Sequence, residues 1–277
     1  MRSSTRAVLA TALAIGAAAL APAAASAWAP ADSATIHPGI QTETAGSGQC
    51  TANFIFTRGS DTYIGQAAHC ASTGAATDTD GCLAQSLPLG TKVTLVGSGA
   101  TGTLAYSSWL TMQGKGETDA DACAYNDLAL VKIDPADVSK VNPSVPGFGG
   151  PTGLGSPGGA LSDVYSYGNS SLRGGITQLS PKQGKLIQTS GNGWNHTLYT
   201  LTPGIPGDSG SGFLSSTGAA FGTLSTVAIA PLPASNGVGD LSKELAYANA
   251  NGFSGTALAN GTEPFTPNIV GAILGAG

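Results

Sequence analysis

Short apolar runs that alternate with turn residues fill this chain from Thr51 onward. Each run has the length of a β-strand, and glycine, proline, serine and threonine are frequent between the runs. Charged residues make up only 10% of the chain, which suits short strands with tight turns better than long amphipathic helices. The sequence therefore predicts an all-β protein, with strands in Phe54–Phe56, Thr62–Ile64, Lys92–Val96, Leu128–Ile133, Asp163–Tyr167, Leu186–Thr189, Leu198–Leu201, Gly212–Leu214 and Ala220–Val227.

Several stretches between these runs are rich in turn-forming residues. Asn142–Gly159 is dense in proline and glycine and is the expected linker between two halves of the chain. Gly97–Gly102 and Gln113–Asp121 are expected to be loops, and Ser215–Gly218 a hairpin turn.

One short helix is predicted near the C-terminus, over Asp240–Asn251. Its first residue can cap the helix, and Leu241, Leu245 and Ala248 fall on one face. Gly252 is placed to end it.

The N-terminus has the features of a secretory signal peptide. Two arginines precede an apolar run over Ala7–Leu20, and the small-x-small site Ala25–Ala27 predicts cleavage before Trp28. The alternative is an uncleaved membrane anchor, but Pro22 and the alanine-rich composition argue against it. We therefore expect residues 1–27 to be removed from a secreted, extracellular protein whose mature form does not enter a membrane.

The charge balance limits the partners of the mature chain. Loss of the two N-terminal arginines leaves nine basic residues against sixteen acidic ones, which argues against nucleic acid or an anionic membrane as a partner. About 250 residues remain, enough for one large β-unit or two small barrels. We expect a monomer.

Four cysteines lie in the first half of the chain, and export makes disulfides the expected state. Three pairings are possible, and the alternative is a zinc site. Wide, irregular spacing and the absence of a CxxC motif argue against zinc, and we expect no metal. The four residues are Cys50, Cys70, Cys82 and Cys123.

Ser209 is the candidate nucleophile, within the turn-forming segment Thr202–Phe213. Glycines on both sides allow a sharp bend that presents its hydroxyl. The same bend lets the N–H groups of Gly207 and Ser209 converge on an oxyanion. The alternative interpretation is a solvated Gly/Ser loop.

A serine hydroxyl needs a base, and the base needs a third group to orient it. The chain has three histidines: His37, His69 and His196. His69 ends an apolar run in a small-residue turn, and Asp127 leads into an apolar strand. His196 lies in a Gly/Asn-rich stretch that predicts a solvated loop, and His37 is expected at the surface.

Three segments together resemble the signature segments of the chymotrypsin-like serine proteases, in that family's order. They are Ala67-Ala68-His69-Cys70, Asp127-Leu128-Ala129-Leu130 and Gly207-Asp208-Ser209-Gly210. The resemblance covers most of the chain after about Gln49.

The resemblance implies two six-stranded antiparallel β-barrels and a short C-terminal helix. Residues 48–145 would form the first barrel, with the histidine and aspartate. Residues 146–277 would form the second barrel, with the serine, and a C-terminal extension. Residues 28–47 would be an N-terminal arm or short pro-segment.

The resemblance also implies a mechanism, that of a serine endopeptidase acting on polypeptides without a cofactor. Ser209 attacks the scissile carbonyl, His69 takes its proton, and Asp127 orients the imidazole. Ser225 matches the serine that supports the aspartate in this family, although an ordinary strand serine is the alternative.

Two structural consequences follow from the same resemblance. The family commonly bridges the strand before the histidine loop to the residue after the histidine, which favours Cys50–Cys70 and leaves Cys82–Cys123. Asp208 is expected in a buried ion pair. No lysine or arginine lies between Trp28 and Arg58, so a tryptic new N-terminus is not the expected partner, and Arg173 is preferred to Arg58.

Substrate preference is predicted mostly from what is missing. Lys- and Arg-specific relatives have an aspartate six residues before the nucleophile, where this chain has Pro203. Glu-specific relatives have a histidine in the following strand, but Gly222–Val227 contains none. Val227 would make the pocket shallower, which favours small or apolar neutral residues. Asp240 is the one carboxylate near enough to intrude, although a helix cap is its expected role.

The chain departs from the family pattern in two places. Ser211 stands where the family has glycine, and the second half has no cysteine, so the pocket wall is expected to be held by packing. Two alternative functions remain, an inactive protease-like binding module and an esterase with the same triad. An α/β-hydrolase is disfavoured because the order of the three residues is different.

Overall fold

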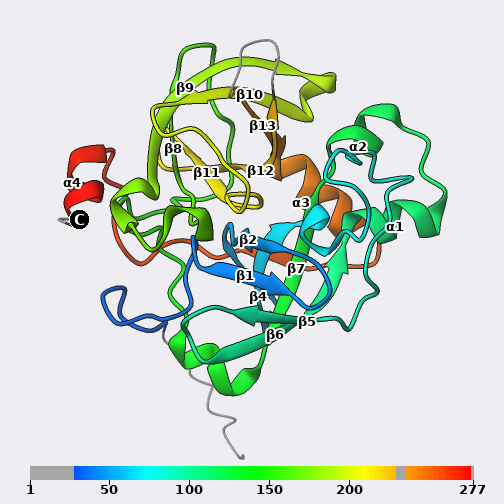
Figure 1. The fold of residues 1–277 in the computed structure, drawn as a ribbon, viewed down its shortest axis with the longest axis horizontal. Helices are drawn as coiled ribbons and strands as arrows, with labels where there is room; N and C mark the ends of the chain where they lie inside the picture. Colours follow the sequence, from blue (N-terminus) through cyan, green and yellow to red (C-terminus); the bar gives the residue numbers. More distant parts are fainter. Residues whose placement is uncertain (1–27, 229–234, 276–277) are drawn as a thin grey trace, which may run out of the picture.

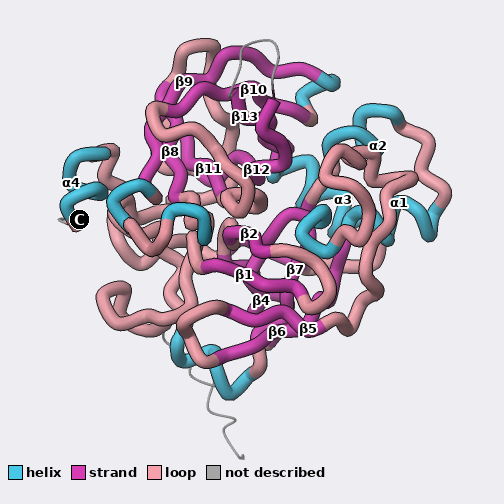
Figure 2. The backbone as a smooth tube through the Cα atoms, viewed as in Figure 1, coloured by secondary structure: helices cyan, strands magenta, loops and turns pink. Residues whose placement is uncertain are grey.

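The structure, a computed structural model, describes residues 28–228 and 235–275, apart from the side chains of Val227 and Ala228. The predicted signal peptide therefore lies outside the described residues. Two β-units, one formed by β1–β7 with β14 and one by β8–β13, lie next to each other (Figure 1). Strands make up both units and the helices lie around them (Figure 2). None of the described helices has the length and apolar character needed to cross a bilayer.

The first unit is an antiparallel sheet of eight strands in the order β14-β3-β4-β7-β6-β5-β1-β2. The expected first barrel had six strands, so this part of the prediction was incomplete. Two segments outside the predicted strands extend the edges of the sheet, one from residues 41–51 and one from the C-terminal region. The strands are β1 (Gln41–Thr44), β2 (Gln49–Thr51), β3 (Ile55–Arg58), β4 (Asp61–Ala67), β5 (Lys92–Leu95), β6 (Ala100–Ser107), β7 (Leu128–Ile133) and β14 (Thr256–Leu258).

The segment expected as an N-terminal arm is integrated into this sheet. Ile36 and Ile40 are buried in its core, and β1 pairs with both β2 and β5. The sequence Gln41–Thr44 contains no apolar run, so pattern reasoning had no signal for a strand there.

The second unit is a closed barrel of six strands in the order β10-β13-β12-β11-β8-β9, as the resemblance implies. Its interior is one apolar cluster that includes Val164, Leu198, Phe213, Phe221 and Val238. The strands are β8 (Asp163–Tyr167), β9 (Pro181–Ser190), β10 (Asn195–Thr200), β11 (Gly212–Ser215), β12 (Ala220–Ala228) and β13 (Ser235–Asp240).

A shared core joins the two units. Phe56 and Tyr63 of the first sheet belong to the same buried cluster as Tyr165 and Leu214 of the second barrel. Phe148, from the stretch predicted as a linker, fills the same cluster and is only 1% exposed. The linker is therefore an irregular but packed segment that fixes one unit against the other.

The predicted C-terminal helix is α3 (Leu241–Ala250), and the Asp240 side chain caps it by accepting from the Lys243 N–H at 2.9 Å. The predicted loop over 113–121 instead overlaps two helices, α1 (Ser108–Lys115) and α2 (Ala120–Tyr125). Both begin at side-chain caps, Ser107 and Asp119, which are the local signals that could have revealed them. A further short helix, α4 (Ile269–Leu274), lies near the C-terminus.

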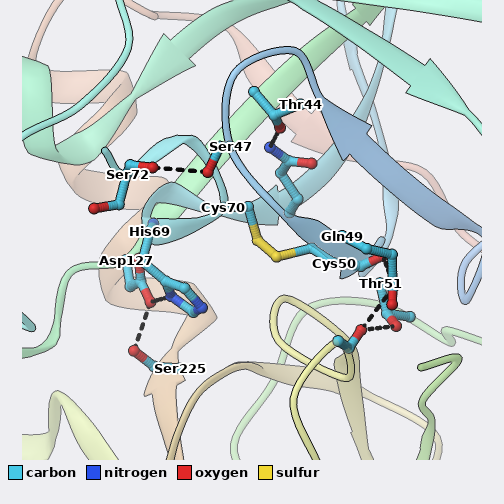
Figure 3. The surroundings of a disulfide bond; sticks show 12 residues. Thr44, Ser47, Gln49, Cys50, Thr51, His69, Cys70, Ser72, Asp127 and Ser225 are labelled. Carbon is cyan, nitrogen blue, oxygen red and sulfur yellow. Dashed lines mark hydrogen bonds and ion pairs between the residues drawn. A yellow bond between two sulfur atoms is a disulfide. The ribbon is translucent and has the colours of Figure 1, made fainter. Parts of the chain in front are cut away.

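The cysteines pair as the resemblance implies, Cys50 with Cys70 and Cys82 with Cys123. The first disulfide ties β2 to the 3₁₀ turn η1 (Ala68–Ala71), which carries His69 (Figure 3). All four sulfur atoms are bonded to sulfur, so none is available as a thiolate ligand for a metal.

Candidate active site

His69 follows directly after β4, in a turn that holds the imidazole against Asp127 (Figure 3). The Asp127 carboxylate accepts two hydrogen bonds from this residue: Oδ1 from the His69 backbone N–H at 2.9 Å and Oδ2 from ring Nδ1 at 2.6 Å. A donating Nδ1 leaves Nε2 as the acceptor nitrogen, which is the tautomer that a general base needs.

The electrostatics of this pair favour a basic imidazole. Burial alone would lower the pKa of His69, but the charge and the hydrogen bond of Asp127 outweigh burial and raise it above its ordinary value. The His69 side chain remains 25% exposed, whereas that of Asp127 is 4% exposed. The carboxylate is thus shielded while the imidazole remains accessible.

Asp127 is held from several sides at the start of β7. Its Oδ2 also accepts from Ser225 Oγ at 2.5 Å, the contact expected for the supporting serine (Figure 3). Its carbonyl oxygen accepts from the Ala68 N–H at 2.7 Å, and its own N–H donates to Glu244 Oε1 at 3.0 Å. Glu244 was not singled out in the sequence, because a glutamate in a first helical turn is the expected residue type there.

Ser209 lines the same pocket, of about 520 Å³, as His69, Asp127 and Ser225. The described residues show no hydrogen bond between the Ser209 hydroxyl and the His69 ring. The turn is fixed through its backbone: Ser209 C=O accepts from the Thr51 N–H at 2.8 Å, and the Gly210 N–H donates to Leu224 C=O at 2.7 Å.

Only glycine fits at position 210. Its φ is +86°, and a Cβ there would lie 2.6 Å from the Thr51 carbonyl oxygen and 2.8 Å from the Ala67 nitrogen. The serine turn therefore packs its backbone directly on the strands that lead to His69.

The N–H groups of Gly207 and Ser209 have no acceptor among the described residues. The Pro206 carbonyl accepts from Ser170 Oγ at 2.5 Å, which turns the Gly207 N–H of the same peptide in the opposite direction. The next carbonyl, of Gly207, is fixed by Thr51 Oγ1 at 2.8 Å and Gln49 Nε2 at 3.0 Å. Both N–H groups are therefore free to donate to a bound group, as the prediction of an oxyanion site needs.

Asp208 is fully buried and pairs with Arg173, the partner preferred in the sequence analysis over Arg58. Arg173 Nη1 and Nη2 lie 2.6 and 2.8 Å from the two carboxylate oxygens. A second cation, Lys182 Nζ, lies 3.0 Å from Asp208 Oδ2 and was not expected. Burial would raise the pKa of Asp208, but Arg173 and Lys182 hold it below its ordinary value.

The segment before the nucleophile is held by hydrogen bonds rather than by packing alone. Lys182 Nζ donates to the carbonyls of Thr202 and Pro203, each at 3.1 Å, and the Gly204 N–H donates to Asn236 Oδ1 at 3.1 Å. The buried Lys182 had no sequence signal, because lysine in a strand ordinarily lies at the surface.

The sequence analysis singled out two further residues of the second barrel, Ser211 as a departure from the family pattern and Val227 as part of the pocket. Ser211 is fully buried, and its hydroxyl has no hydrogen-bond partner among the described residues. The side chain of Val227, predicted to make the pocket shallower, lies outside the described residues.

The prediction of a solvated loop for His196 was wrong. This residue lies in β10, an interior strand of the barrel that pairs with both β9 and β13, and it is 3% exposed. Its Nδ1 lies 2.9 Å from Thr189 Oγ1 and its Nε2 lies 2.9 Å from Asp240 Oδ2. Asp240 is thus occupied by His196 and by the helix cap.

His37, expected at the surface, is partly exposed. Its ring is partly buried and donates through Nδ1 to the Pro38 carbonyl at 2.8 Å. Burial lowers the pKa of His37. Ile36 and Ile40, on either side of it in the sequence, are core residues.

No family model and no curated protein matches this sequence. Solved structures do match. A glutamic-acid-specific serine protease that utilises a histidine triad in substrate binding is 15% identical with a TM-score of 0.50, over 81% of this chain and 100% of that one. Thermobifida fusca Protease A is 18% identical with a TM-score of 0.49, over 82% and 99%. The thermostable serine protease AL20 from an extremophilic microorganism is 17% identical with a TM-score of 0.49, over 80% and 99%.

The likeness to the glutamic-acid-specific protease, with a TM-score of 0.50, is a likeness of fold. The chain has the two-barrel chymotrypsin-like fold, with a half-barrel sheet as its first unit and a closed barrel as its second.

Proposed function

We propose that this chain is an exported serine endopeptidase that hydrolyses polypeptides through an acyl-enzyme on Ser209. The observation that carries the proposal is the arrangement around one pocket: His69 bonded to a shielded Asp127, Ser209 beside them, and two free backbone N–H groups. A lone serine or a lone histidine would have little weight, but this combination is the one that acyl transfer needs.

In the proposed reaction, Ser209 Oγ attacks the scissile carbonyl while His69 Nε2 accepts its proton. The carbonyl oxygen gains negative charge, which the N–H groups of Gly207 and Ser209 stabilise. His69 then gives the proton to the leaving amine, and Asp127 stabilises the imidazolium between these steps. Water then attacks the acyl-enzyme with His69 again as the base, which releases the product and regenerates Ser209. The proposed reaction uses no cofactor and no metal.

The proposed substrates have a small or apolar neutral residue before the scissile bond. Pro203 offers no carboxylate for a basic side chain, and Asp240 is bonded to His196 and the α3 cap. A histidine triad like that of the Glu-specific structure is excluded by number: the chain has three histidines, and one is the proposed base.

The proposed location is extracellular, as a monomer, after removal of residues 1–27. The two disulfides and the predicted signal peptide support export. The acidic balance of the chain supports a peptide rather than a nucleic acid as its partner.

Labelling with a fluorophosphonate probe followed by peptide mapping tests the proposal. We expect modification of Ser209, and we expect Ser209→Ala to lose labelling and peptide hydrolysis. Ser216→Ala, in an exposed hairpin turn, is the matched control and should retain both. Labelling of another serine would overturn the assignment, and ester hydrolysis without peptide hydrolysis would favour the esterase.

A further inference from the structure

Glu244 is a fully buried carboxyl group with no cationic partner among the described residues. It lies in the first turn of α3 and is not among the residues that line the pocket. Its Oε1 accepts from the Asp127 N–H at 3.0 Å, and its Oε2 lies within hydrogen-bonding distance of Thr223 Oγ1, at 3.0 Å. A buried glutamate without a cation is costly, so its two contacts must account for its presence.

These contacts connect three parts of the fold. Glu244 comes from the C-terminal helix, Asp127 from the first sheet, and Thr223 from β12 of the second barrel. Thr223 Oγ1 also accepts from Asn53 Nδ2 at 3.4 Å. Asn53 belongs to the first unit, so these hydrogen bonds link the second barrel back to it. No other described side chain bonds the backbone N–H of Asp127.

The Glu244 contact completes the hydrogen bonding of Asp127. The carboxylate is held by His69 and Ser225, and the carbonyl by the Ala68 N–H. The remaining polar atom is the N–H, which is buried and would be unpaired without Glu244. The peptide on the N-terminal side of Asp127 is therefore held at both ends: Glu244 of α3 accepts from its N–H, and Ser108 Oγ of α1 donates to its carbonyl, that of Asn126, at 2.8 Å.

We propose that Glu244 is a positioning residue for the triad, which holds the Asp127 backbone so that its carboxylate meets the His69 ring. This inference rests on the proposed function. The Glu244 side chain touches no reacting atom, and it acts through Asp127.

The charge state of Glu244 fits this role. Burial raises the pKa of Glu244 to about 8; the hydrogen bond from the Asp127 N–H opposes this rise and the charge of Asp127 adds to it, so the neutral form predominates at pH 7. The other titratable groups that interact with it are Asp240 at the start of α3 and Tyr106 in β6. A neutral carboxyl accepts the Asp127 N–H without placing a second negative charge beside the triad.

Three variants test the proposal by kinetics. Glu244→Ala should lower kcat about 10- to 100-fold with little change in KM, because a small displacement of Asp127 misaligns the base. Glu244→Gln retains an oxygen for the Asp127 N–H and should remain within about threefold of the wild type at pH 7. Leu245→Ala, the neighbouring buried residue of α3, loses packing without touching Asp127 and should keep its kcat wherever it is folded.

An NMR titration of the His69 ring tests the same inference without turnover. In a Ser209→Ala background, Glu244→Ala should move the His69 pKa down toward its ordinary value, because Asp127 no longer holds the ring. Glu244→Gln and Leu245→Ala should leave it in place. A folded Glu244→Ala variant with an unchanged His69 titration would overturn the positioning role. If the fluorophosphonate probe failed to label Ser209 in the wild-type protein, the proposed function would be overturned. The His69 titration would still decide whether Glu244 positions Asp127.

Discussion

The Ser170 hydroxyl donates a 2.5 Å hydrogen bond to the carbonyl oxygen of Pro206 and thereby orients the peptide that ends in the Gly207 N–H. Because the peptide is planar and trans, this contact turns the Gly207 N–H away from Ser170. The orientation of the free Gly207 N–H is thus fixed by a residue from a different loop.

Ser170→Ala should therefore lower kcat/KM by about 10- to 100-fold, because the peptide loses its fixed orientation and one oxyanion donor with it. Steady-state hydrolysis and the rate of fluorophosphonate labelling would both measure this loss. Ser171→Ala is the matched control, since the Ser171 side chain is exposed. Equal activity in both variants would show that the Pro206–Gly207 peptide needs no support from Ser170.

The buried ion pair at Asp208 predicts a large effect of Arg173 on stability. Arg173→Met should cost about 3–5 kcal/mol, because it breaks a buried pair, although Lys182 offsets part of the loss. Arg58→Met, at a partly exposed site, should cost about 1 kcal/mol or less. Chemical denaturation measures both, and a comparable loss at the two arginines would contradict the assignment.

The same pair predicts that no new N-terminus is needed for activity. Since two side-chain cations already pair with the Asp208 carboxylate, extra residues before Trp28 should leave kcat unchanged.

The lowered pKa of Asp208 also predicts a loss of stability in acid. The ionised carboxylate stabilises the fold fully above the ordinary pKa of 3.8, and this contribution is lost as the pH falls through the lowered pKa.

The activity should depend on one histidine. His69 must be neutral to accept a proton, so kcat/KM should rise with pH through an apparent pKa above 6.5, in the direction that Asp127 shifts it. His69→Ala should remove activity. His196→Gln should lower stability, because the residue is buried, yet leave the pH of half-maximal kcat/KM unchanged. A shift of that pH in His196→Gln would mean that the second histidine contributes to the titration.

Glu244 predicts that stability falls as the pH rises from 4.5 to about 8. Its folded pKa of about 8 is above the value of 4.5 expected for the unfolded chain. Its favourable contribution is therefore full below pH 4.5 and is lost as the pH rises toward 8, by at most about 1.4 kcal/mol per pH unit. Glu244→Gln does not ionise, so its free energy of unfolding should fall less than that of the wild type between pH 5 and 8. Parallel curves for the two proteins would contradict the raised pKa.

The sequence by itself determined the features that are encoded within a few residues. Gly207 and Gly210 identify the serine turn because only glycine adopts its φ angles without strain, and the structure has both at positive φ. Asp240 identifies the start of α3 because a cap is a contact with the next turn of the same chain. His69, Asp127 and Ser209 could be picked out for the same reason, because each lies in a short segment with its own local pattern and the three segments follow one another in a fixed order.

Only the tertiary structure decided which distant groups meet. Glu244 contacts a residue 117 positions away, and Ser225 contacts one 98 positions away. His196 has the flanks of a surface turn, but its strand is paired on both sides in the closed barrel and its side chain is buried. Lys182 is buried because Asp208 compensates its charge. Local patterns report the preference of a segment for water or for the core. Burial of a polar group also depends on whether a partner from another element is present, and that is a property of the packed fold.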